Sequence, residues 1–363
     1  MASTGRGLGL RAGAVLFVVA AVMLITGFVS GSARGEEGPD ESRETAAAPF
    51  RASVLASGLQ RPWGMDFLPN GDALITERDT GRLLRVKPDG RTSVEQVIPE
   101  QGEGEGGLLG IALSPYYAKN QMVYAYVTTA TDNRVIRFRL GGTPQPVVTG
   151  IPKGTIHNGG RIAFGPDNKL YIGTGDSGNT NLSQNKRSLG GKILRVKPNG
   201  KIPGNNPFGN EVWSYGHRNV QGLAWDASGR MYATELGQAT YDEVNKIVRG
   251  KNYGWPNAEG VSNNPAYTNP VAVFDPDVAS PSGAAIYRGN KISGWNGDLL
   301  FAALRGERLW KLERNAAGGI ESRQSLLNGT YGRLRAVEQA PDGSVWLLTT
   351  NGSNDKVVRL SPR

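Results

Sequence analysis

His157 is one of only two histidines in 363 residues, and it precedes a segment whose pattern predicts a β-hairpin. Apolar runs at Ile162–Phe164 and Leu170–Ile172 flank a Gly-Pro-Asp-Asn turn, which is typical of two antiparallel strands. Because Asp176 follows the second strand, the ends of the hairpin would bring an imidazole beside a carboxylate. Imidazole can accept and return a proton near neutral pH, and a carboxylate can orient it. The segment indicates acid–base chemistry, with a purely structural histidine as the alternative.

The second histidine, His217, occupies the equivalent position before another predicted strand, and Arg218 follows it. Arg333 and Arg335 alternate at the start of a later strand, where alternate side chains share a face. Arg305 lies in a loop between two strands. Guanidinium groups are fixed planar cations that bind carboxylates. These four arginines could converge on an anion with several negative charges, or they could pair with Asp and Glu between repeats.

Two loops could supply oxygen ligands. Glu105 lies among the glycines of Gly102–Gly107, which allow a ligand to approach the backbone closely. In the segment Thr234–Gln238, backbone carbonyls could bind Ca²⁺, a hard ion that takes oxygen ligands. A solvated surface loop explains the glycines around Glu105 equally well. The spacing of the acidic residues does not by itself define a metal site.

A repeated unit of short strands must position these residues. The unit contains an apolar strand, a turn rich in Gly, Asp, Asn or Pro, a second strand and a third, and it recurs roughly every 45 to 70 residues. Its first strands are expected at Trp63–Phe67, Leu109–Leu113, Ile162–Phe164, Val220–Trp225, Gly283–Tyr287 and Leu334–Gln339. Six copies predict an all-β, six-bladed β-propeller of four-stranded antiparallel blades. The separate strand Ala52–Leu55 should pair with the last blade, which closes the ring and removes an open sheet edge.

The composition defines three segments and excludes some classes of site. Residues 1–33 resemble a signal peptide or an N-terminal membrane anchor, residues 34–49 form an acidic and disordered spacer, and residues 50–363 form the propeller. We therefore expect an exported protein, either secreted or held at the outer face of the cell membrane. There is no cysteine, which excludes disulfides and thiolate metal sites. Residues 51–363 carry a net charge of +9 − (−1) = +10, but without a Lys/Arg run that would indicate nucleic acid.

An ordered set of motifs extends through these repeats. The motifs are Gly106-Gly107-Leu108-Leu109-Gly110, His157-Asn158-Gly159-Gly160-Arg161, Gly190-Gly191-Lys192-Ile193-Leu194-Arg195-Val196, Gly216-His217-Arg218-Asn219, Gln221-Gly222-Leu223-Ala224, Asp242-Glu243-Val244-Asn245 and Asn252-Tyr253-Gly254-Trp255-Pro256. In this order they resemble the soluble PQQ-dependent glucose and aldose sugar dehydrogenase family, over roughly Leu55 to Pro362. The resemblance implies a quinoprotein enzyme that binds pyrroloquinoline quinone (PQQ) and Ca²⁺ on one face of the propeller.

The resemblance also implies a reaction. His157 would remove the proton from the C1 hydroxyl of an aldose, while the C1 hydride passes to the quinone and a lactone forms. Asp176 would orient His157, and Arg218 would polarise the quinone oxygen with Asn219 beside it. The partners would be the aldose substrate and an external electron acceptor.

The remaining site residues follow from the same resemblance. Arg305, Arg333 and Arg335 would hold the carboxylates of the cofactor. Phe274 stands where related sequences often place a tryptophan over it. The carbonyls of Gly237 and Gln238 would ligate Ca²⁺, and Glu105 would contact sugar hydroxyls. Two alternatives remain open: a propeller that has lost the cofactor and binds carbohydrate or another surface, and a Ca²⁺-dependent lactone hydrolase, which would require a cage of carboxylates on the axis.

Overall fold

The computed structural model describes residues 48–363. The predicted signal peptide or anchor, and nearly all of the predicted spacer, lie outside the described residues. Within residues 48–363, neither helix is long and apolar enough to cross a bilayer.

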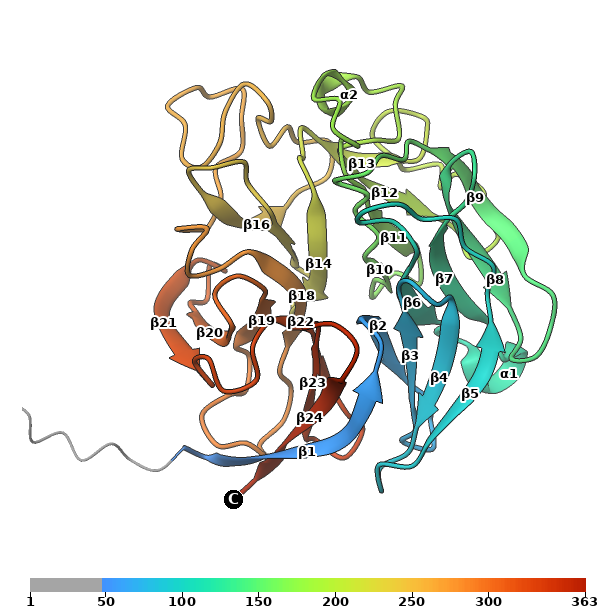
Figure 1. The fold of residues 1–363 in the computed structure, drawn as a ribbon. Coiled ribbons are helices and arrows are strands. Elements are labelled where there is room, and N and C mark those ends of the chain that lie inside the picture. The colour runs from blue at the N-terminus through green and yellow to red at the C-terminus, as the bar shows by residue number, and fades with distance from the viewer. Residues whose placement is uncertain (1–47) are drawn as a thin grey trace, which may run out of the picture. The chain divides into compact units, whose positions relative to one another are not determined.

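Six four-stranded antiparallel sheets are arranged around one axis as the blades of a six-bladed β-propeller, as predicted (Figure 1). Blade 1 contains β2 (Pro62–Phe67), β3 (Ala73–Glu77), β4 (Arg82–Val86) and β5 (Thr92–Val97). Blade 2 contains β6 (Leu108–Leu113), β7 (Val123–Thr128), β8 (Asn133–Phe138) and β9 (Gln145–Ile151). Blade 3 contains β10 (Ile162–Phe164), β11 (Leu170–Gly173), β12 (Lys192–Val196) and β13 (Val212–Tyr215).

The second half of the ring follows the same order. Blade 4 contains β14 (Val220–Trp225), β15 (Met231–Glu235), β16 (Asp242–Ile247) and β17 (Ala272–Phe274). Blade 5 contains β18 (Pro281–Ile286), β19 (Leu299–Ala303), β20 (Arg308–Arg314) and β21 (Ile320–Leu326). Blade 6 contains β22 (Leu334–Gln339), β23 (Val345–Thr349), β24 (Asp355–Pro362) and the N-terminal strand β1 (Phe50–Leu59). Two single-turn helices, α1 (Tyr117–Asn120) and α2 (Asn181–Gln184), lie in loops.

The burial of the strands explains which of them the sequence revealed. The second strand of each blade is buried along its whole length, as in β7 and β15, because neighbouring blades cover both of its faces. Such strands read as continuous apolar runs. The outermost strands β5 and β21 are largely exposed and polar, so they gave no recognisable pattern. The sequence therefore revealed three strands in each blade but not the fourth strand of blades 1 to 5, whereas the fourth strand of blade 6 is the predicted N-terminal strand.

The N-terminal strand closes the ring. In β1, Ala52 is paired with Leu360 and Val54 with Val358 of β24, which confirms the predicted pairing with the last blade. Phe50 begins this strand and packs edge-on against Trp295 of blade 5, with ring centroids 5.3 Å apart. The first strand thus completes blade 6 and also fills the core between blades 5 and 6.

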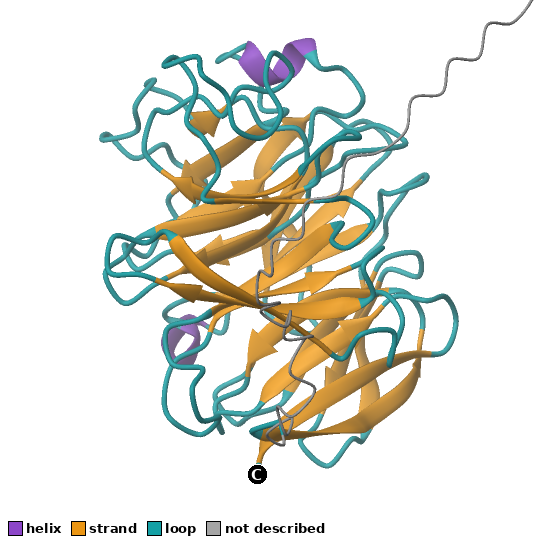
Figure 2. Ribbon diagram, turned by 90° about the vertical axis from the view of Figure 1, so that its left-hand side faces the viewer, coloured by secondary structure: helices purple, strands orange, loops and turns teal. Residues whose placement is uncertain are grey.

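The innermost strands all begin at the same end of the axis, which we call the upper face. His157, Arg218 and Arg333 each lie just before one of these strands, β10, β14 and β22 respectively. In the view of Figure 2, strands fill the body of the propeller and loops project from it. The repeat therefore brings residues that are far apart in sequence to one rim.

We predict that Phe50→Ala lowers the free energy of unfolding by about 3–5 kcal/mol, because it removes a buried aromatic side chain from the closing strand. Chemical denaturation monitored by circular dichroism measures this loss. Val54→Ala, on the exposed side of the same strand, is the matched control and should change stability by no more than about 0.5 kcal/mol. Equal effects of the two substitutions would contradict the role given to Phe50.

Candidate active site

His157 and Asp176 are in direct contact at the upper face. Nδ1 of His157 lies 2.7 Å from Oδ1 of Asp176, as the hairpin suggested. Asp176 is fully buried and also accepts hydrogen bonds from the backbone N–H of Gly178 and the indole N–H of Trp255. Burial raises the pKa of Asp176, but these three hydrogen bonds outweigh it and hold the pKa below its ordinary value. An ionised Asp176 receives the Nδ1 proton of His157, so the free lone pair of the neutral imidazole is on Nε2.

The backbone at His157 is held in an unusual conformation. His157 has a φ of +55°, in the left-handed region that residues with a side chain rarely adopt. Its N–H donates to Oε2 of Glu105 at 2.7 Å, and its carbonyl accepts the N–H of Ser177. A Cβ on Gly175 would lie 1.8 Å from the His157 carbonyl oxygen, so only glycine permits this approach. Contacts from blade 2 and blade 3 therefore fix the histidine before any ligand binds.

A cavity of about 340 Å³ opens beside this pair, on the axis of the propeller. Glu105, Asn158 and Gly159 line the wall next to His157. The cavity is further lined by Trp63, Arg78, Asn219, Gln221, Leu236, Ser280, Leu304, Arg333 and Arg335. Three of these side chains are cationic and only Glu105 is anionic, so the cavity favours an anionic ligand.

Two of the three cations of the wall have no carboxylate partner among the described residues. Arg78 pairs with Asp79 at 2.5 Å, but no carboxylate within residues 48–363 pairs with Arg333 or Arg335. Arg335 is buried and donates only to Gln221 (3.1 Å) and to a serine hydroxyl (3.3 Å). Burial and the neighbouring cations lower the pKa of Arg335 to about 9, so it stays charged at neutral pH.

A second buried guanidinium, that of Arg161, lies next to Arg335. Both face the indole ring of Trp63, at 4.3 Å for Arg161 and 5.6 Å for Arg335. Gln221 joins them, because its backbone carbonyl accepts from Arg161 and its side-chain oxygen accepts from Arg335. Nη2 of Arg161 and Nε of Arg335 have no hydrogen-bond partner among the described residues. Burying charged groups so incompletely paired is costly, which is typical of a site that receives a ligand.

Arg218 and Asn219 join the cavity to the next blade. The Arg218 guanidinium donates to the carbonyl of Leu236 at 3.2 Å and lies 5.4 Å from the ring of Trp255. Its Nε is buried without a partner, and burial lowers its pKa. The side-chain oxygen of Asn219 accepts the N–H of Gly159, which ties blade 4 to the segment that carries His157.

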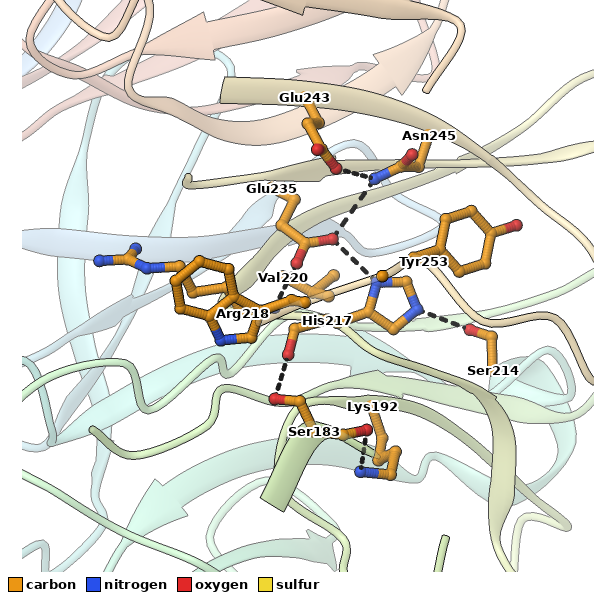
Figure 3. Close-up of polar contacts among 12 residues, drawn as sticks. Ser183, Lys192, Ser214, His217, Arg218, Val220, Glu235, Glu243, Asn245 and Tyr253 are labelled. Carbon is orange, nitrogen blue, oxygen red and sulfur yellow. Dashed lines mark hydrogen bonds and ion pairs between the residues drawn. The ribbon is translucent and has the colours of Figure 1, made fainter. Parts of the chain in front are cut away.

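His217 does not take part in the cavity. It is completely buried, with Nδ1 2.8 Å from Glu235 and Nε2 2.8 Å from Ser214, and it stacks on Tyr253 (Figure 3). Glu235 also accepts the backbone N–H of Arg218. The two histidines share a position in the repeat, but His157 lies next to residues that line the cavity, whereas His217 is buried behind Arg218.

The predicted metal loop is ordered by two carboxylates. Asp242 accepts the N–H of Gly237 at 2.9 Å and that of Ser280 at 2.7 Å. Oε1 of Glu259 accepts the N–H of Gln238 and of the next three residues, at 2.8 to 3.3 Å. Burial raises the pKa of Asp242 to about 6. Among residues 48–363 there is no group of three or more His, Cys, Asp or Glu side chains arranged to hold a metal, so a cation here would depend on backbone oxygens.

Of the expected site residues, Glu105, Asn219, Arg333 and Arg335 line the cavity, and His157, Asp176 and Arg218 lie beside it without lining it. Two further residues that were expected at the cofactor lie away from the cavity. Arg305 is exposed and pairs with Asp277 at 2.8 Å, and it does not line the cavity. Phe274 lies in the outermost strand of blade 4 and is buried against Phe301 and Trp310 in the core between blades 4 and 5. The expectation for Phe274 is corrected for a physical reason: an aromatic residue at the end of an outer strand fills the space between blades.

Most of the chain matches a known protein family. Residues 59–359 match the family described as glucose/sorbosone dehydrogenase. The chain belongs to this family. The resemblance inferred from the motifs is therefore confirmed, and the protein is an enzyme of an oxidoreductase family.

Individual family members agree in sequence and in fold. An aldose sugar dehydrogenase from Streptomyces coelicolor, solved in its PQQ-bound form, has a TM-score of 0.80 and 47% sequence identity, covering 87% of this chain and all of that chain. Quinoprotein glucose dehydrogenase B of Acinetobacter calcoaceticus is 31% identical over 70% of this chain and 62% of its own length. The aldose sugar dehydrogenase of Escherichia coli is 28% identical over 88% of this chain and 94% of its own.

Sequence reasoning missed Trp63, Arg78 and Arg161. Arg161 stood inside a quoted motif but had no role assigned to it. Trp63 lies at the start of the innermost strand β2, close to the position in the repeat that His157 and Arg333 occupy in theirs. Arg78 follows β3, as Asp176 follows β11. A comparison of these two positions in all six blades would have found both residues.

A second cavity, of about 430 Å³, lies at the opposite end of the axis and is lined mainly by apolar side chains. Two carboxylates lie in it. Asp66 accepts the N–H groups of Phe67 and Leu113 at 2.7 Å each. Burial and the charge of Asp66 raise the pKa of Glu338 to about 8, although Arg161 opposes this shift. Glu338 is therefore largely protonated at neutral pH in the folded protein.

This gives a pH-dependent prediction. Because the unfolded chain ionises Glu338 near 4.5 and the folded chain only near 8, its contribution to stability is complete below pH 4.5 and is lost as the pH rises through 8. In the wild type this loss lowers the free energy of unfolding by at most about 1.4 kcal/mol per pH unit, and Glu338→Gln should abolish it. Denaturant unfolding of both proteins between pH 4.5 and 8.5 measures it. For the exposed control Glu321→Gln, the difference in stability from wild type should not change with pH. A pH-independent difference between Glu338→Gln and wild type would contradict the prediction.

Proposed function

We propose that the protein oxidises the C1 hydroxyl of aldose sugars to lactones with PQQ as cofactor and His157 as the general base. The observation that carries this proposal is the His157–Asp176 pair beside a cavity whose wall presents Arg333 and Arg335 without carboxylate partners. The pair can take up a proton, and the arginines can bind an anion.

The donor set of the cavity fits PQQ, which carries three carboxylates. Arg335 would hold one carboxylate deep in the cavity, and Arg333 would hold another at the exposed rim. Arg78, which also lines the cavity, adds a third cation. Arg218 and Asn219 lie on the blade 4 side, where they would face the quinone. The S. coelicolor relative is described as PQQ-bound and the A. calcoaceticus relative as a quinoprotein, which supports the same cofactor here.

We propose that Ca²⁺ would bind to the carbonyls of Gly237 and Gln238. Asp242 and Glu259 bind the N–H groups of this loop and so fix its backbone. A Cβ on Gly237 would lie 1.8 Å from the carbonyl oxygen of Tyr241, so the loop can adopt this path only with glycine there. Because the ligands are backbone atoms, the site does not depend on the side chain of Gln238.

The residues of the chain perform the proton transfer. When bound, PQQ supplies an ortho-quinone that accepts the hydride leaving C1 of the sugar. His157 receives the hydroxyl proton on Nε2, since Nδ1 is engaged with Asp176. Asp176 stabilises the resulting imidazolium, and it is fixed for this by its own hydrogen bonds. Glu105 lines the cavity next to His157, where it would accept hydrogen bonds from sugar hydroxyls.

The proposal extends to location and partners. The apolar stretch and the basic residues within positions 1–33 support export, with the enzyme secreted or held outside the cell membrane. Electrons would then pass to an external acceptor.

Reconstitution tests the function. Adding PQQ and Ca²⁺ to the purified protein should produce aldose-dependent reduction of a redox dye, measured with a panel of sugars. His157→Ala should lower kcat by about 10²–10⁴-fold while PQQ still binds, because only the base is removed. Failure of the wild-type protein to bind PQQ or to turn over any aldose would contradict the proposal.

A matched pair of arginine substitutions tests the cofactor cavity. Arg335→Met should weaken PQQ binding by about 10–100-fold, since one charge-assisted hydrogen-bonding group is lost. Arg305→Met should leave affinity within about threefold, because its exposed ion pair lies off the cavity. Fluorescence titration of each purified variant with PQQ measures both affinities. Equal losses in the two variants would show that the cofactor reaches the position of Arg305.

A further inference from the structure

Trp255 occupies a position between the two halves of the candidate site. Its indole N–H donates to Oδ2 of Asp176 at 2.8 Å, in a buried contact. The face of the same ring lies 5.4 Å from the guanidinium carbon of Arg218. One side chain therefore touches the carboxylate that binds His157 and the arginine of the next blade.

The loop that carries Trp255 is fixed independently of these contacts. The backbone N–H of Trp255 donates to the carbonyl of Gly216 at 2.9 Å. Its carbonyl accepts from the side chain of Gln184 in α2 at 2.6 Å. Gln184 and Asn252 also form two amide hydrogen bonds, of 2.9 and 3.0 Å. The insertion of blade 4 is thus bound to the insertion of blade 3, and the backbone that carries the indole is held in place beside Asp176.

We propose that Trp255 is a positioning residue for the proton transfer: its indole N–H fixes Asp176 and thereby sets how readily His157 holds a proton. The inference rests on the proposed base role of His157. Asp176 has two oxygens, of which Oδ1 serves His157 and Gly178, while Oδ2 accepts from Trp255. Removing the donor on Oδ2 concentrates negative charge on the carboxylate. The imidazolium of His157 is then stabilised further, and the neutral base forms only at higher pH.

The charges around the pair do not replace this donor. Glu105 binds the backbone N–H of His157. The charge of Arg218 acts on Asp176, but its guanidinium donates to the carbonyl of Leu236 and not to the carboxylate. A phenylalanine at position 255 keeps an aromatic face for Arg218 and most of the packing, so Trp255→Phe isolates the loss of the N–H. Trp310→Phe is the matched control, because Trp310 lies in β20 of blade 5 and its indole donates to the carbonyl of Val278, in the loop before that blade.

The decisive experiment uses the fact that the chain has only two histidines. Two-dimensional NMR of the ¹⁵N-histidine-labelled protein, with and without PQQ and Ca²⁺, resolves the imidazole signals of His157 and His217 as the pH is varied. In Trp255→Phe the titration midpoint of His157 should rise by about 0.5–1 pH unit relative to wild type. Trp310→Phe should not move it. The His217 signals should be the same in all three proteins, because both of its ring nitrogens are bound to Ser214 and Glu235.

Activity provides a second readout. In Trp255→Phe the acid limb of kcat/KM should move to higher pH by the same amount, whereas a merely structural defect would lower the rate without moving the limb. An unchanged His157 midpoint in folded Trp255→Phe would overturn the proposal. The NMR titration needs no turnover, so a shifted midpoint in a protein that oxidises no aldose would refute the proposed function and leave the coupling intact.

A measurement on the wild-type protein covers the case in which Trp255→Phe does not fold. Among the indole N–H signals of the seven tryptophans, one should titrate with the midpoint of His157, because its acceptor is the carboxylate that His157 touches. If none of the seven follows His157, the proposal is overturned.

Discussion

Closure of the ring is the constraint on which the rest of the structure depends. The pairing of β1 with β24 joins the two ends of the described chain and leaves blade 6 with its full four strands. Six sheets are then held around one axis, and their innermost strands must approach closely. At Gly110, a Cβ would lie 2.2 Å from the carbonyl oxygen of Gly160 on the next blade, which shows how tightly the blades meet. This fixed spacing of the blades sets the positions of the side chains that meet at the upper face.

Four ionisable side chains lie near the axis of the propeller, in surroundings that disfavour their charged forms. Arg161 and Arg335 lie on the upper half and Glu338 and Asp66 on the lower half, all packed among the inner strands. Burial lowers the pKa of the arginines and raises that of the carboxylates, so the charged form of each group is less stable than it would be in water. The fold bears this cost because the many buried contacts between blades stabilise it elsewhere. At the upper end, Nη2 of Arg161 and Nε of Arg335 have no hydrogen-bond partner among the described residues, which favours an anionic ligand.

Motifs predicted part of the site and the repeat predicted its location. His157 and Asp176 were recognisable because a short hairpin brings its own two ends together, which is a local effect. Arg333 and Arg335 were recognisable because they begin a strand of the repeat. The position of Arg305 was not predictable, since a loop between strands can place a long side chain either over the axis or, as here, against Asp277 at the surface. Phe274 was misplaced because its outer strand has no sequence pattern that shows which way it faces.

By itself, the sequence determined the number of blades, the closing strand, the family and the local pair of histidine and carboxylate, because each depends on residues close together or on a regular repeat. Only the tertiary structure decided which histidine lies next to the cavity, which arginines lack a carboxylate partner, and that Trp255 binds Asp176. Those outcomes depend on contacts between different blades, such as the 79 residues that separate Asp176 from Trp255. The geometry of the closed ring sets such contacts, and no local pattern encodes it.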